Sequence, residues 1–133
     1  MTTTPAIKII AALGALILLA GAAFHMTAMP GVRQSADVIE LEFFRKALPG
    51  MRVIPALHWI FIAFLSLGLS RYKSNACAAI LMAFGCWVLV DALVTLIYVG
   101  PFLGVYMLGL AGLLLLVAGL MQRKFVRADT KRV

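Results

Sequence analysis

Four long apolar runs constrain this chain more than any other feature of its sequence. They cover residues 7–29, 53–70, 76–99 and 102–121. A helix needs about 20 mostly apolar residues to cross a bilayer, and only helices and closed barrels satisfy their backbone polar groups in hydrocarbon. We therefore predict an all-α membrane protein: a four-transmembrane-helix bundle that forms a single membrane domain over residues 1–133.

The composition and the placement of charge support this setting. Hydrophobic residues make up 64% of the chain and charged residues 13%, whereas soluble domains are about 45–50% apolar and about a quarter charged. The net charge is +7, but the basic residues lie at chain ends and in loops. This distribution suits anionic lipid head groups better than nucleic acid, which needs a continuous basic surface. The expected partners are the lipid bilayer and a larger membrane complex or a second copy of this chain, with no nucleic acid.

The distribution of lysine and arginine predicts the orientation of the bundle. Of the 12 basic residues, eight gather on the side of the termini and four in the first connection. Because positive residues are retained in the cytoplasm, both termini, including a basic tail over 122–133, are expected there. The small chain suggests a bacterial inner membrane. An alternative interpretation of the first run is a signal peptide cleaved near "MTA", which would leave three spans, but the run is long and Lys8 is its single basic residue.

Two connections between the runs carry structural signals. Residues 36–48 place apolar side chains on one broad arc at helical spacing, and Pro49–Gly50 follows. We predict a short amphipathic helix here, interfacial or capping the bundle, that ends at this Pro-Gly pair. Only Gly100 and Pro101 separate the last two runs, so these helices are expected to form a tight antiparallel hairpin.

Ionisable residues inside spans are costly and are candidates for function. By their positions in the predicted spans, His25, His58 and Asp91 all lie in the outer half of the membrane. A candidate polar cluster adds residues at related positions in the last two spans: Thr95, Tyr98 and Tyr106. Whether these side chains meet depends on helix rotation, and a purely structural role as hydrogen-bonding glue remains open.

Three classes of function are compatible with these residues. Short loops and small-residue seams favour a non-enzymatic accessory or interaction subunit. A first alternative is a metal or haem site that uses His25 and His58, with the thioethers of Met26 and Met29 as further ligands. A second is a small proton-coupled transporter or a lipid- or quinone-binding protein that uses Asp91.

No catalytic motif in the sequence adds a fourth class of function. The sequence carries no HExxH or GxSxG motif, and its two cysteines, Cys77 and Cys86, are not in a CxxC arrangement. We expect no catalytic residues and no cofactor, with haem or copper as the alternatives.

The layout resembles that of small four-helix bacterial inner-membrane proteins to which no activity is assigned. The likeness lies in a first helix ending "GAAFHMTAMPG", a connector ending "FRKALPG" and a second helix carrying "ALHWIFIAFLSLGLS". It covers most of the chain and implies the fold, and it carries no activity.

Overall fold

The protein folds into five helices, seen in a computed structural model that describes residues 3–130. The helices are α1 (Pro5–Thr27), α2 (Met29–Asp37), α3 (Glu42–Leu69), α4 (Asn75–Val99) and α5 (Leu103–Thr130). Four helical segments are long and apolar enough to cross a membrane: α1 together with α2, α3, α4 and α5. The predicted all-α bundle with four membrane-spanning helices is confirmed, and the chain is a multi-pass membrane protein.

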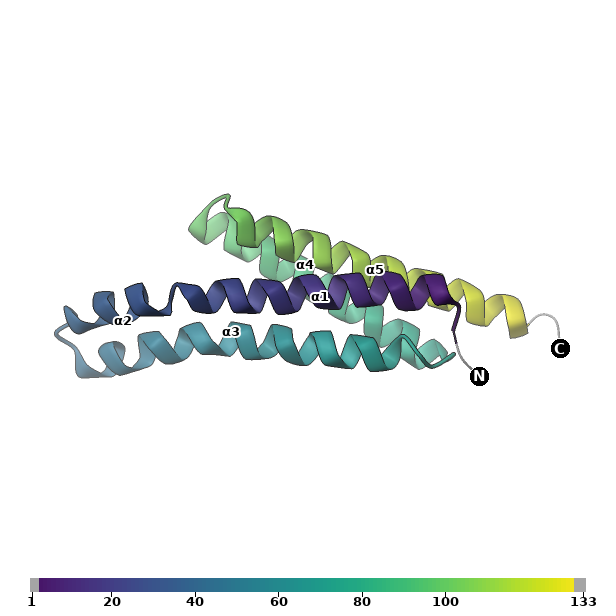
Figure 1. Cartoon of the computed structure of the whole chain (residues 1–133), viewed down its shortest axis with the longest axis horizontal. Helices are drawn as coiled ribbons and strands as arrows, with labels where there is room; N and C mark the ends of the chain where they lie inside the picture. Colours follow the sequence, from purple (N-terminus) through teal and green to yellow (C-terminus); the bar gives the residue numbers. More distant parts are fainter. Residues whose placement is uncertain (1–2, 131–133) are drawn as a thin grey trace.

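The helices follow the spatial order α3, α1, α5, α4. Helix α1 packs against both α3 and α5, and α5 packs against α4, whereas α3 and α4 contact each other sparsely. The start of α1, the end of α5 and the α3–α4 connection lie at one end, here called the terminal end (Figure 1). The α2–α3 and α4–α5 connections lie at the opposite, distal end. The four spans therefore alternate in direction.

Glycines allow α4 and α5 to approach each other closely. A Cβ atom added at Gly85 would lie 2.5 Å from the backbone nitrogen of Leu116 and 2.8 Å from the backbone oxygen of Gly112. At Gly119 an added Cβ would lie 2.8 Å from the nitrogen of Met82. In lipid, where apolar burial alone does not drive helices together, such close backbone packing is a main source of association.

The turn between these two helices depends on its glycine and proline. Gly100 has φ +92°, a conformation that is strained for residues with a Cβ atom. Its N–H donates to the carbonyl of Leu96 at 3.0 Å, and Pro101 cannot continue the helix. The tight hairpin predicted at Gly100–Pro101 is thus present.

Polar contacts at the terminal end attach the α3–α4 connection to α5. Gln122 is fully buried, and its Nε2 donates to the carbonyl oxygens of Leu69 at 3.3 Å and Tyr72 at 2.6 Å. Lys73 in the same connection forms an ion pair with Asp129. The Gln122 amide thus pairs with the carbonyl of the last residue of α3 and with one in the connection that follows it.

The first connection differs from its prediction. The helix expected over 36–48 is interrupted at residues 38–41, and α3 begins at Glu42 and continues through both Pro49 and Pro55. The prediction that the helix ends at Pro49–Gly50 was wrong. Each proline removes one backbone N–H donor, but contacts with α1 and α2 hold α3 in place. The short helix of this connection is α2, which precedes the predicted segment.

The basic segment after the last span also has a defined structure. Residues 122–130 continue α5 as helix, so most of the predicted tail is the last part of a spanning helix. Lys131 and Arg132 lie outside the described residues.

Substitution of Gly85 tests the close packing of α4 on α5. We expect Gly85→Ala to lower the free energy of unfolding by about 1–3 kcal/mol, because the added methyl group meets backbone atoms that cannot move independently. Gly109→Ala on α5 is the control, since nothing lies within 4 Å of its Cβ position. Thermal unfolding in detergent, followed by circular dichroism, measures both. Equal midpoints for the two variants would contradict this packing.

Candidate functional site

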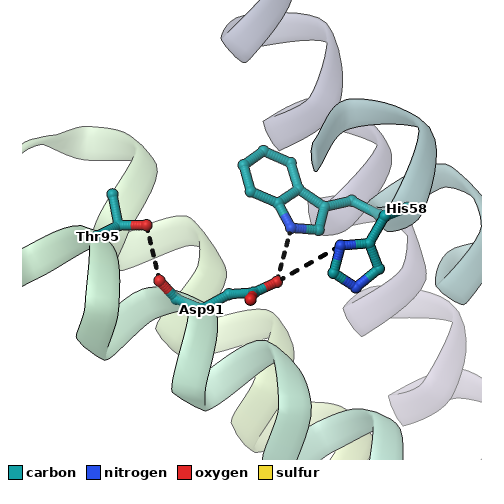
Figure 2. Close-up of polar contacts among 4 residues, drawn as sticks. His58, Asp91 and Thr95 are labelled. Atoms are coloured by element: carbon teal, nitrogen blue, oxygen red, sulfur yellow. Dashed lines mark hydrogen bonds and ion pairs between the residues drawn. The ribbon is translucent and has the colours of Figure 1, made fainter. Parts of the chain in front are cut away.

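Asp91 on α4 is the centre of the polar contacts between α3 and α4 (Figure 2). The indole Nε1–H of Trp59 donates to its Oδ2 at 3.1 Å. Nδ1 of His58 lies 3.8 Å from the same oxygen, which is a distance for ion pairing rather than hydrogen bonding. Within α4, the hydroxyl of Thr95 donates to the backbone carbonyl of Asp91 at 2.7 Å. Three of the predicted residues, His58, Asp91 and Thr95, therefore meet at Asp91, and Trp59 joins them as a further donor.

Helix geometry explains why adjacent residues on α3 have different surroundings. Successive residues lie about 100° apart around a helix, so His58 and Trp59 approach the same oxygen of Asp91 from different sides of α3 and differ in burial. Trp59 is 7% exposed and shares the buried face of α3 with Ala56 and Ala63. His58 is half-buried and packs edge-on against Trp87 of α4, with ring centroids 5.9 Å apart.

His25 joins the cluster from α1 through Trp59 and the backbone of α3. Its ring packs edge-on against the indole at 5.1 Å, and its Nε2 lies 3.0 Å from the backbone oxygen of Arg52. Since a carbonyl only accepts hydrogen bonds, Nε2 carries the proton and donates. Pro55 removes one N–H donor from this turn of α3. The imidazole of His25 thus donates a hydrogen bond to the backbone of α3, next to the turn in which Pro55 supplies no N–H.

These residues border a cavity of about 450 Å³ at the distal end. Its volume lies within the range of roughly 300–1,000 Å³ that is typical of small-molecule sites. All four spans contribute to the walls. The polar lining residues are His25, Thr27, Arg52, Trp59 and Thr95, and the remainder are apolar or glycine.

Arg52 leaves a polar atom of this cavity wall without a partner. Its Nε is buried and has no hydrogen-bond acceptor among residues 3–130. An unsatisfied buried donor costs about 1–3 kcal/mol, and more when the group is charged. Buried side-chain atoms of Ser66 and Gln122 also lack partners, but neither residue lines this cavity. Arg52 is therefore the cavity-lining residue that carries a buried polar atom without a partner among residues 3–130.

Other predicted residues lie away from the cluster. Tyr98 is 84% exposed and Tyr106 is 65% exposed. Tyr98 follows Asp91 by about two turns on the same stripe, but the sparse packing between α3 and α4 leaves that stripe uncovered. Tyr106 borders apolar grooves beside α5 instead.

The residues predicted as metal ligands do not form a shared centre. His25 contacts Arg52 and Trp59, whereas the neighbours of His58 are Asp91 and Trp87. Met26 packs against the core of the bundle, and Met29 is buried within α2. Across residues 3–130, no group of three or more His, Cys, Asp or Glu side chains could hold a metal ion. The geometry gives no support to a haem or copper site.

Sequence reasoning missed two residues of the site, Trp59 and Arg52. The candidate cluster does not include Trp59, and Arg52 enters only as one of the four basic residues in the first connection. Their spacing gives a usable signal: Arg52, Ala56, Trp59 and Ala63 recur every three or four residues, which places them on one helical face. An arginine on the buried face of a span is a candidate for binding.

Comparisons with known protein families, with curated proteins and with solved structures find no match to this chain.

Substitutions at Asp91 test whether its hydrogen bond holds α3 to α4. Asp91→Asn keeps an acceptor for Trp59, so we expect a small change in stability, whereas Asp91→Leu leaves the indole N–H unpaired. Hydrogen bonds between membrane helices contribute on average about 0.6 kcal/mol and up to about 1.7. Unfolding midpoints of both variants, combined with Trp59→Phe in a double-mutant cycle, give the coupling energy. Strict additivity of Asp91→Leu and Trp59→Phe would contradict the contact.

Proposed function

We propose that this protein binds an amphiphilic ligand, a lipid or a quinone, in the cavity at the distal end. The observation that carries the proposal is the unpartnered Nε–H of Arg52 in the wall of a cavity of about 450 Å³. A ligand whose polar head presents oxygen acceptors would pair with the guanidinium group of Arg52. The apolar part of the same ligand would lie against the remaining wall, which includes Phe24, Val99 and Leu108.

The surroundings of Arg52 support a ligand with acceptor oxygens over a cationic one. The carboxylate of Asp91 already accepts from Trp59, and the ring of His25 donates to a backbone carbonyl. Among the lining residues Arg52 carries a positive charge and none is acidic, so the charge at the cavity wall favours a ligand with acceptor oxygens. An accessory role within a larger complex remains a prediction. We favour ligand binding over that role because the chain has this cavity.

A cavity-filling variant separates binding from folding. Gly21 lines the cavity and has nothing within 4 Å of its Cβ position, so Gly21→Leu should occupy the space without a backbone clash. We expect this variant to lose ligand binding while its unfolding midpoint stays the same or rises.

Fluorescence of Trp59 measures binding at this position. Trp87→Phe leaves Trp59 as the single tryptophan of the two in the chain. Titration with phosphatidylglycerol and with a short-chain ubiquinone analogue, beside phosphatidylcholine, distinguishes an anionic head from a quinone. Arg52→Gln should weaken binding about tenfold, by the loss of a charge-assisted hydrogen bond, whereas Arg45→Gln on the exposed face should not. Unchanged titrations in Gly21→Leu would contradict the proposal.

We further propose that the protein lies in a bacterial inner membrane with its terminal end in the cytoplasm. The support is the excess of basic residues at that end, which favours cytoplasmic retention. The lipid-facing surface that this setting requires is present as exposed apolar side chains along all four spans.

Cysteine labelling tests this orientation. In a background with Cys77→Ala and Cys86→Ala, one new cysteine is placed at Ser35 on α2 or at Asn75 at the start of α4, both exposed. We expect a membrane-impermeant maleimide to label the Ser35 position in intact cells and the Asn75 position only after lysis. The reverse pattern would place the termini outside.

A further inference from the structure

A second hollow lies on the α4–α5 pair, at the terminal end and far from the cavity around Arg52. It is an open groove of about 600 Å³. Helix α4 forms one wall and two arginines of α5 form the other. The lining residues are Asn75, Ala79, Met82, Ala83, Cys86, Arg123 and Arg127.

The α4 wall is a continuous apolar strip with one polar end. Its residues recur every three or four positions, so they lie along one face of the helix. Ala79 and Ala83 are exposed and small, which leaves a shallow channel rather than a ridge. Asn75 begins the helix and is the polar end of this strip. The channel thus runs from the membrane surface into the depth of the bilayer, as a lipid chain does.

The α5 wall carries two positive charges at the polar end of the channel. Arg123 and Arg127 are one helical turn apart and exposed. Neither pairs with a carboxylate within residues 3–130, whereas Lys73 in the adjoining connection is paired with Asp129. Guanidinium groups bind phosphate oxygens in a bidentate manner and are less strongly hydrated than ammonium groups. Two unpaired guanidinium groups beside an apolar channel suit a phosphate that carries acyl chains.

The start of α4 contributes to the same electrostatic field. The first turn of this helix contains no acidic residue, so the positive end of its dipole is not neutralised locally. Asn75 of this turn lines the groove together with Arg123 and Arg127. The two charged side chains that line the groove, Arg123 and Arg127, are both positive.

We propose that this groove binds one anionic phospholipid from the leaflet at the terminal end. Its phosphate lies between Arg123 and Arg127, and an acyl chain follows Ala79, Ala83 and Cys86. The site depends neither on the distal cavity nor on the direction of the protein in the membrane. It requires only that a bilayer surrounds the spans.

Native mass spectrometry of the detergent-solubilised protein tests this site. Phosphatidylglycerol and phosphatidylcholine are each added to the natural protein and to Arg123→Gln/Arg127→Gln. We expect the double variant to bind phosphatidylglycerol about tenfold or more weakly, since each basic residue near a lipid surface contributes substantially. Binding of phosphatidylcholine should change little.

A charge-matched control separates the groove from the general positive field. Arg71→Gln/Lys124→Gln removes two exposed basic residues from the same end but none that line the groove, and it should retain phosphatidylglycerol binding within about threefold. Equal losses in the two double variants would overturn the proposal. So would displacement of the lipid by excess inorganic phosphate, which would indicate a phosphate site. Bulky substitution of the channel, Ala83→Trp, should also remove the lipid, and full binding by that variant would exclude the acyl-chain contact.

Discussion

The hydrogen bond from Trp59 to Asp91 joins two helices that otherwise contact each other sparsely. In hydrocarbon, a carboxylate and an indole N–H each need a partner, and water is not available to supply one. Pairing them therefore fixes how α3 and α4 are rotated at this depth. With Trp59 held in that orientation, its ring also meets His25 of α1. One polar contact thus relates three of the four spans to one another.

The packing of the other helices determines where free volume is left. Helix α5 lies against both α1 and α4, and its glycines and alanines bring the backbones close on both sides. The side chains of Leu89, Met82 and Leu115 pack against glycines in these seams and leave little room there. At the distal end, small residues such as Gly21 and Ala28 line the space beside Pro55 instead, and no bulky neighbour fills it. The cavity is therefore a consequence of small residues placed where the helices do not converge.

The lengths of the apolar runs and the positions of ionisable residues within them could be predicted from the sequence. The rotation of each helix about its own axis could not. The four spans, the Gly100–Pro101 turn and the placement of His58 and Asp91 in the same half of the membrane follow from spacing, whereas the contact between His58 and Asp91 depends on helix rotation. Tyr98 lies on the same face of α4 as Asp91, yet it is exposed. A shared helical face does not show how far along the helix the contact with a neighbouring helix extends. The continuation of α3 through Pro49 was missed because the cost of a lost N–H is local, whereas the packing that offsets it comes from α1 and α2.

Polar groups at the two ends of the bundle have different roles, and their hydrogen bonds distinguish those roles. At the terminal end, the Nε2 donor of Gln122 is paired with two carbonyls and Lys73 is paired with a carboxylate. These contacts hold the α3–α4 connection against α5, although Oε1 of Gln122 is buried without a partner among residues 3–130. At the distal end, Arg52 keeps a buried donor unpaired beside open volume. A fold under no other constraint would lose this cost by substitution with an apolar residue. Here Arg52 is one of four basic residues in the first connection of the chain and also lines the cavity, so its position bears on the proposed binding site.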